Sequence, residues 1–193
     1  LLAMFGDALL RARYVRYLEK RIDLARAEES RLRDDPAFGP LAAFYRQRFE
    51  RARDAFVDRH RRDLTAAFAG FQDRGSLEII TCAATHGFLP LLAPVPSAVR
   101  SQIRVGVEEY RRAFGRRPRG IWLPECGYAP GLDRVLRDED LRFFVMESHG
   151  VLHARPRPRF GVHAPVYCPS GVAAFGRDAE SSKQVWSAVE GYP

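Results

Sequence analysis

Apolar residues recur every three or four positions through residues 1–76, and arginine and glutamate occupy the positions between them. This spacing gathers the apolar side chains on one face and predicts amphipathic helices. The expected helices begin at Asp7, break at Asp34-Asp35-Pro36, resume near Leu41 and end before Gly75. We interpret residues 1–76 as a helical segment whose arginine-rich outer faces are solvated surface.

The pattern changes at Leu77, where short β-branched apolar runs alternate with helical stretches. Three strands are expected, over residues 77–84, 120–125 and 141–147. Ser97 is a suitable N-cap for the first intervening helix, and Gly115 is a suitable stop. Strand–helix–strand alternation with short connections predicts right-handed crossovers and parallel strands. The expected fold class for residues 77–150 is therefore α/β, an open sheet or a barrel.

The alternation stops beyond Gly150. Arginine and proline alternate over residues 155–159, which predicts a stiff loop. Two short apolar runs, 166–168 and 172–175, flank a Pro-Ser-Gly turn and predict a small β-hairpin. We expect residues 151–193 to form a loop and hairpin region next to the strand ends.

The composition is that of a globular protein, with 46% hydrophobic and 28% charged residues. No apolar run approaches the roughly 20 residues that a membrane helix needs, so we expect no membrane association. The net charge of +7 raises the question of nucleic acid. Arginine supplies every basic residue except Lys20 and Lys183, and these charges lie along the whole chain. We interpret the excess as a compositional bias and expect no nucleic-acid partner.

Cys82, Cys126 and Cys168 are widely spaced and form no CxxC pair. This spacing indicates neither a disulfide framework nor a zinc ribbon, and it favours a reducing, cytoplasmic setting. The chain begins at Leu1 without a signal peptide and ends at Pro193 in a turn sequence. We therefore expect an internal piece of a longer protein, of undetermined oligomeric state.

Each of the three expected strands ends in polar or ionisable residues. Thr85-His86 follows the first strand, Glu125 the second, and Glu147-Ser148-His149 the third. Because parallel strands present their carboxyl ends at one edge, we expect these groups to converge at a candidate active site. Period-two alternation would also place Glu125 on the same face as Leu123.

A carboxylate beside a histidine suits three roles: nucleophile, general acid or base, and metal ligand. The set His86, Glu125 and His149 is a possible zinc or iron site, but no HxH or HxxE spacing supports it. In the last segment, Trp186 and Tyr192 are suited either to stack on sugar rings or to cover a core edge. Both interpretations stay open from the residues alone.

Three strings occur together and in order: Ala-Ala-Thr-His-Gly-Phe-Leu-Pro-Leu-Leu at 83–92, Gly-Ile-Trp-Leu-Pro-Glu-Cys-Gly-Tyr at 120–128, and Phe-Gly-Arg-Asp through Gly-Tyr-Pro at 175–193. They resemble glycoside hydrolase family 57 and, within it, the 1,4-α-glucan branching enzymes. The likeness runs over essentially the whole chain. It implies part of a (β/α)7-type barrel with parallel strands, preceded by a helical segment.

The resemblance also implies an activity: a retaining enzyme that cuts an α-1,4-glucan and rejoins the piece through an α-1,6 bond. Glu125 matches the family's catalytic nucleophile, and His86 matches a residue that lines the sugar site. The implied partner is an α-glucan such as amylose or a glycogen-like polysaccharide, with no cofactor and no metal. Further substrate contacts are expected at Glu147, His149, Asp178, Trp186 and Tyr192.

A retaining enzyme needs a second carboxyl group about 5 Å from the nucleophile. From the residues alone, the candidates are Glu147, Asp178 and Glu180. The family instead implies an aspartate on a later strand, beyond Pro193, so we expect the isolated chain to turn over little or nothing. The stretch 146–150, Met-Glu-Ser-His-Gly, also departs from the Asp-Thr-His-Gly that the family leads us to expect.

Other functions stay open. A family 57 α-amylase or 4-α-glucanotransferase would keep Glu125 and differ in its acceptor. A metal-dependent deacetylase or hydrolase would use His86 and His149. A catalytically silent glucan-binding protein would keep binding and lack turnover.

Overall fold

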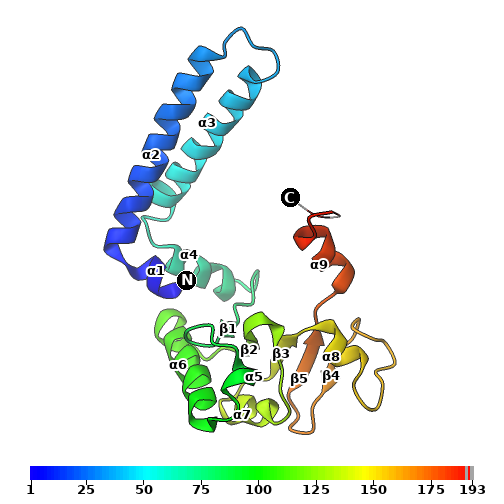
Figure 1. The fold of residues 1–193 in the computed structure, drawn as a ribbon. Coiled ribbons are helices and arrows are strands. Elements are labelled where there is room, and N and C mark those ends of the chain that lie inside the picture. Colours follow the sequence, from blue (N-terminus) through cyan, green and yellow to red (C-terminus); the bar gives the residue numbers. More distant parts are fainter. Residues whose placement is uncertain (190, 192–193) are drawn as a thin grey trace. The chain divides into compact units, whose positions relative to one another are not determined.

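The computed structural model describes residues 1–189 and 191, and the chain divides into two compact units, Leu1–Leu77 and Glu78–Pro193 (Figure 1). The helices of the first unit are α1 (Leu2–Gly6), α2 (Ala8–Arg31), α3 (Gly39–Asp54), a π-helical turn η1 (Ala55–Arg59) and α4 (Leu64–Asp73). The elements of the second unit are β1 (Thr81–Cys82), α5 (Leu89–Leu92), α6 (Pro96–Phe114), β2 (Gly120–Trp122), a 3-10 turn η2 (Pro124–Cys126), α7 (Leu132–Asp138), β3 (Phe143–Met146), α8 (Ser148–Leu152), β4 (Val166–Tyr167), β5 (Ala173–Gly176) and α9 (Ala179–Trp186).

The first unit is helical, as its 3.6-residue periodicity predicts, and α2 and α3 form a hairpin (Figure 1). Asp7 caps α2 by accepting a hydrogen bond from the Leu10 amide at 2.8 Å. The apolar stripe of α2 buries Leu18 and Ile22, which contribute to the core of this unit. No helix among the described residues is both long and apolar enough to cross a membrane.

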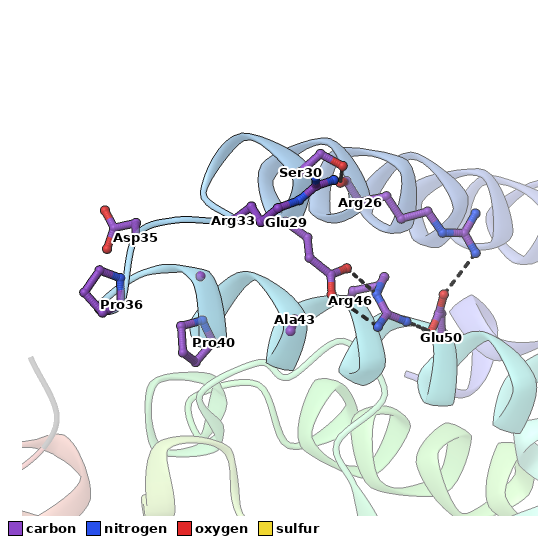
Figure 2. A pocket seen from close by; sticks show the side chains of 11 residues that line it. Arg26, Glu29, Ser30, Arg33, Asp35, Pro36, Pro40, Ala43, Arg46 and Glu50 are labelled. Carbon is purple, nitrogen blue, oxygen red and sulfur yellow. Dashed lines mark hydrogen bonds and ion pairs between the residues drawn. The ribbon is translucent and has the colours of Figure 1, made fainter.

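A groove of about 790 Å³ lies between α2 and α3, close to the loop that joins them (Figure 2). Its central charge is Arg46, which bonds to Glu29 at 2.6 Å and to Glu50 at 2.8 Å. Glu50 also pairs with Arg26 at 3.0 Å. These arginines and glutamates therefore satisfy one another within the hairpin. The groove contains none of the site residues expected from the sequence.

The second unit holds a five-stranded sheet in the order β1-β2-β3-β5-β4. The first three strands are parallel, with α6 connecting β1 to β2 and α7 connecting β2 to β3 (Figure 1). Ile121 of β2 lies opposite Thr81 on one side and Phe144 on the other. The α/β class with parallel strands after a helical segment is thus confirmed.

The expected hairpin exists, because β4 and β5 pair antiparallel. However, β5 also pairs in parallel with β3, from Phe143 opposite Ala173 to Met146 opposite Gly176. Assigning residues 172–175 to a hairpin alone was therefore incomplete. The buried side chains of Val172 and Ala174 pack into the same core as β3, which makes β5 a fourth parallel strand.

The core of this unit lies between the sheet and its helices. Ile121, Leu123 and Phe144 are completely buried, and the Tyr128 ring stacks on Phe144 with centroids 5.4 Å apart. Helix α6 approaches β1 so closely that a Cβ atom on Gly106 would clash with the carbonyl oxygen of Cys82. This close approach fixes β1 and the turn that follows it.

The expected cap of α6 is wrong. The helix begins at Pro96, and Val95 is its N-cap without any side-chain hydrogen bond. Proline has its φ already set for a first helical position, where the amide that it lacks would have no partner within the helix. Pro96 therefore starts the helix, and Ser97 falls inside it. The expected stop at Gly115 is confirmed, with φ at 68°.

Candidate active site

Both β1 and β2 end in sharp turns made by residues other than glycine. His86 has φ at 58°, Glu125 at 50° and Cys126 at 54°. Such backbone conformations cost of order 1–3 kcal/mol each and persist only where the surroundings enforce them. The two motifs therefore hold their ionisable side chains in enforced positions.

The turn after β2 overturns one expectation from the strand pattern. Glu125 does not share a face with Leu123, because the strand ends at Trp122 and residues 124–126 form a 3-10 turn. The amide of Cys126 bonds to the carbonyl of Leu123 at 2.8 Å and closes this turn. As a result Leu123 is fully buried, whereas the Glu125 side chain is 76% exposed. The carboxylate is open to a ligand.

The structure brings His86 and Glu125 together across the ends of neighbouring strands. The Nε2 atom of His86 lies 3.4 Å from Oε1 of Glu125. The other ring nitrogen, Nδ1, lies 3.2 Å from the Sγ atom of Cys82. One imidazole therefore links a thiol on β1 to a carboxylate at the end of β2.

The His86 turn is held from the side by Gln102 of α6. Its side-chain oxygen accepts the Thr85 amide at 3.0 Å, and its side-chain nitrogen donates to the Thr85 hydroxyl at 2.8 Å. Its backbone carbonyl accepts the Ala84 amide at 2.9 Å. A single helical residue thus satisfies three polar groups of the loop that presents His86. No local sequence pattern points to Gln102, because its role depends on the packing of α6 against β1.

Glu147 lies at the end of β3, and its amide bonds to the Cys126 carbonyl at 3.0 Å. Its carboxylate pairs with Nη2 of Arg177 at 3.2 Å and accepts the Ser148 amide at 3.1 Å. The guanidinium also lies 3.9 Å from the Cys126 Sγ atom. Glu147 is thus connected through Cys126 to the turn that carries Glu125.

Arg177 is a site residue that the sequence analysis missed. Its guanidinium turns to the Glu147 carboxylate. The reason is the parallel pairing of β5 with β3, which sets the Arg177 amide 2.9 Å from the Met146 carbonyl. Treating residues 172–175 as a further parallel strand would have predicted that Arg177, which follows them, lies at the same edge of the sheet as Glu125 and Glu147.

The other expected contacts are more dispersed. Asp178 caps α9 by accepting the Ser181 amide at 2.7 Å, and hydrogen bonding to Ser181 lowers the pKa of this carboxyl. His149 is exposed in the short helix α8, and Trp186 is 79% exposed at the end of α9. Tyr192 lies outside the described residues.

The alternative metal site is not assembled. Over residues 1–189 and 191, no group of three or more His, Cys, Asp and Glu side chains is arranged to hold a metal ion. The three cysteines are free thiols, and burial raises the pKa of each of them. Cys126 is buried within the turn that carries Glu125.

Two curated relatives are similar to nearly all of this chain. A 1,4-alpha-glucan branching enzyme of Thermococcus kodakarensis is 30% identical over 97% of this chain and 31% of its own length. A probable 1,4-alpha-glucan branching enzyme of Mycobacterium tuberculosis is 33% identical over 91% of this chain and 33% of its own length. The chain therefore spans about a third of these relatives.

Solved structures also match nearly all of this chain with about a third of their own length. The alpha-amylase AmyC of Thermotoga maritima superposes with a TM-score of 0.92 at 44% identity, over all of this chain and 37% of that one. A GH57-type branching enzyme of Pyrococcus horikoshii has a TM-score of 0.85 at 28% identity, over 96% of this chain and 37% of that one. The model of glycosyl hydrolase family 57 matches residues 3–186. The chain thus belongs to glycosyl hydrolase family 57.

Proposed function

We propose that the enzyme containing this chain is a 1,4-α-glucan branching enzyme and that Glu125 is its catalytic nucleophile. The observation that carries this proposal is the His86–Glu125 pair, 3.4 Å apart at the ends of two neighbouring parallel strands of a family 57 chain. The similarity to branching enzymes of two organisms supports the choice of reaction.

In this proposal the exposed Glu125 carboxylate attacks the anomeric carbon of an α-1,4-linked glucose unit. A second carboxyl group about 5 Å away protonates the leaving glycosidic oxygen and leaves a covalent glycosyl-enzyme. The same group then removes the proton from the 6-hydroxyl of another glucan, whose oxygen displaces Glu125 and forms the α-1,6 bond. Two inversions at the anomeric carbon give net retention.

The second carboxyl group is proposed to lie on a segment beyond Pro193, as the family resemblance implies. The local geometry favours this choice over two of the three candidates within the chain. Glu147 is engaged by Arg177 and Ser148, and Asp178 is engaged as the cap of α9. Carboxylates held in this way are better placed to orient groups than to shuttle protons.

We further propose that Glu147, His149, Asp178, Trp186 and Tyr192 contact the glucan. The exposed indole of Trp186 offers an apolar surface of the kind on which sugar rings stack. Glu147 is one methylene longer than the expected aspartate, and its carboxylate contacts Arg177. We propose that Arg177 holds the Glu147 carboxylate in its orientation toward the substrate.

A second candidate function is α-amylase activity, and one comparison favours it. The structure of the alpha-amylase AmyC is 44% identical to this chain, against 28% for the branching enzyme structure. The same nucleophile serves both reactions, and the difference is whether water or a glucan hydroxyl resolves the intermediate. A cytoplasmic location is also proposed, supported by the free thiols at Cys82, Cys126 and Cys168. A role in glycogen formation is proposed as what the branching reaction would serve.

The deciding experiment uses the complete enzyme that contains this chain, incubated with amylose, while iodine colour and new reducing ends are followed together. Branching predicts falling colour with few new reducing ends, and Glu125→Gln should stop the fall. Reducing ends that rise in step with the loss of colour would show a hydrolase instead. Equal activity of the two proteins would overturn the assignment of Glu125.

A second prediction concerns the residue that holds the His86 turn. Gln102→Ala in the complete enzyme removes two side-chain hydrogen bonds to Thr85. We expect kcat to fall by roughly thirtyfold, because two lost bonds to a positioned group, worth about 1 kcal/mol each, add about 2 kcal/mol to the barrier. Gln47→Ala on the exposed face of α3 is the matched control and should leave kcat unchanged. Equal rates for the two variants would show that Gln102 does not position the loop.

A further inference from the structure

The thiol of Cys82 lies directly behind the proposed catalytic pair. Its Sγ atom is 3.2 Å from Nδ1 of His86, whose Nε2 faces Glu125. We propose that Cys82 is a positioning residue, whose thiol donates to Nδ1 of His86 and thereby keeps the Nε2–H directed at the Glu125 carboxylate. This inference rests on the proposed function and assigns a new residue to the same site.

The direction of the two hydrogen bonds follows from the chemistry of imidazole. In a neutral imidazole one ring nitrogen carries a hydrogen and donates, and the other ring nitrogen can only accept. A nucleophilic carboxylate is ionised and accepts only, so Nε2 of His86 must carry the hydrogen in order to bond to Glu125. Nδ1 is then an acceptor, and Cys82 is the group within reach that can donate to it.

The surroundings of Cys82 keep the thiol in the donating form. Burial raises the pKa of Cys82 above its ordinary value, so the sulfur retains its proton at neutral pH. The alternative tautomer would place a lone pair of Nε2 against the Glu125 carboxylate. A protonated thiol therefore favours the one ring tautomer that supports an ionised nucleophile.

The backbone fixes the sulfur and the ring relative to each other. The β1 strand holds Cys82 opposite Trp122, and its carbonyl packs against Gly106 of α6. The His86 amide bonds to the Ala83 carbonyl at 3.1 Å, and φ at 58° turns the imidazole back over the strand. The backbone of the motif therefore places the two side chains within reach of each other.

The test measures kcat and KM on amylose for the complete enzyme with Cys82→Ala and Cys82→Ser. We expect Cys82→Ala to lower kcat about three- to tenfold, the usual range for one hydrogen bond, with KM changed less than about twofold, since the thiol does not touch substrate. The serine hydroxyl can donate to Nδ1 and should restore part of the loss. Cys168→Ala, which also removes a half-buried thiol, is the control and should match the wild type.

A double-mutant cycle separates positioning from a general structural role. His86→Gln keeps an N–H donor for Glu125 but has no Nδ1, so Cys82→Ala should cost nothing further in that background. The same loss in both backgrounds, or no loss in either, would overturn the inference. Glu125→Gln is measured in parallel. If Glu125→Gln stays active, the proposed function is wrong. If Glu125→Gln is inactive and Cys82→Ala keeps the wild-type kcat, this inference alone is overturned.

Discussion

Glu125→Ala in the complete enzyme should lower kcat by about four orders of magnitude or more, because no covalent intermediate can form without the nucleophile. The truncated side chain leaves room for a small anion beside the anomeric carbon. We therefore expect azide to restore part of the turnover of an activated α-glucoside and to give a glucosyl azide of inverted configuration. Chromatography that identifies this inverted anomer shows from which face of the sugar ring the carboxylate attacks.

The control for this variant is Glu108→Gln, which neutralises an exposed carboxylate of α6 that pairs with Arg111 at 3.6 Å. Such a surface pair contributes little, so its kcat should equal that of the wild type. If Glu125→Ala keeps more than about a tenth of the activity, Glu125 cannot be the nucleophile. Product formation unaffected by azide would indicate that the carboxylate acts in another way.

Gly106→Ala should lower the free energy of unfolding by about 2–3 kcal/mol, the cost typical of an overpacked core position. The new methyl group would clash with the backbone carbonyl of Cys82, which cannot rotate away as a flexible side chain could. Relief would require α6 to move off β1, and the bond from the Thr81 hydroxyl to the Gly106 carbonyl, 2.9 Å long, would lengthen. The shift in the denaturant midpoint measures the effect.

A matched substitution separates this clash from helix propensity. Gly70→Ala lies inside α4, where the nearest atom to a new Cβ is the mobile end of Arg74 at 3.4 Å. Alanine is the better helix former by about 1 kcal/mol, so this variant should be as stable as the wild type or more stable. Equal destabilisation by both substitutions would contradict the close packing of α6 on β1.

The candidate site shows where sequence reasoning succeeds. Strands of buried apolar residues followed by polar groups predicted that His86 and Glu125 would meet, and they lie 3.4 Å apart. Parallel strands bring their carboxyl ends to one edge whatever the details of the loops, so this prediction needed only the order of the elements. The family motifs pointed to the same two residues.

Two predictions were wrong at places where a local sequence pattern was extended to a turn or to the start of a helix. Alternation placed Glu125 beside buried Leu123, but the backbone leaves the strand after Trp122 and turns Glu125 outward. Ser97 looked like a cap from its neighbours in sequence, yet Pro96 starts the helix. The Glu125 turn is locally unfavourable and is enforced by tertiary contacts, which no local pattern contains. The start of α6 instead follows from Pro96 itself.

The sequence by itself determined the helical first segment, the strand–helix alternation and the two strand-end motifs, because all three follow from the period of apolar positions and the residues that end each run. Only the tertiary structure decided that β5 joins β3, that Arg177 therefore pairs with Glu147, that Gln102 holds the turn before His86, and that Cys82 contacts the His86 ring. These contacts join residues brought together by the packing of strands and helices, and that packing depends on three-dimensional fit between surfaces.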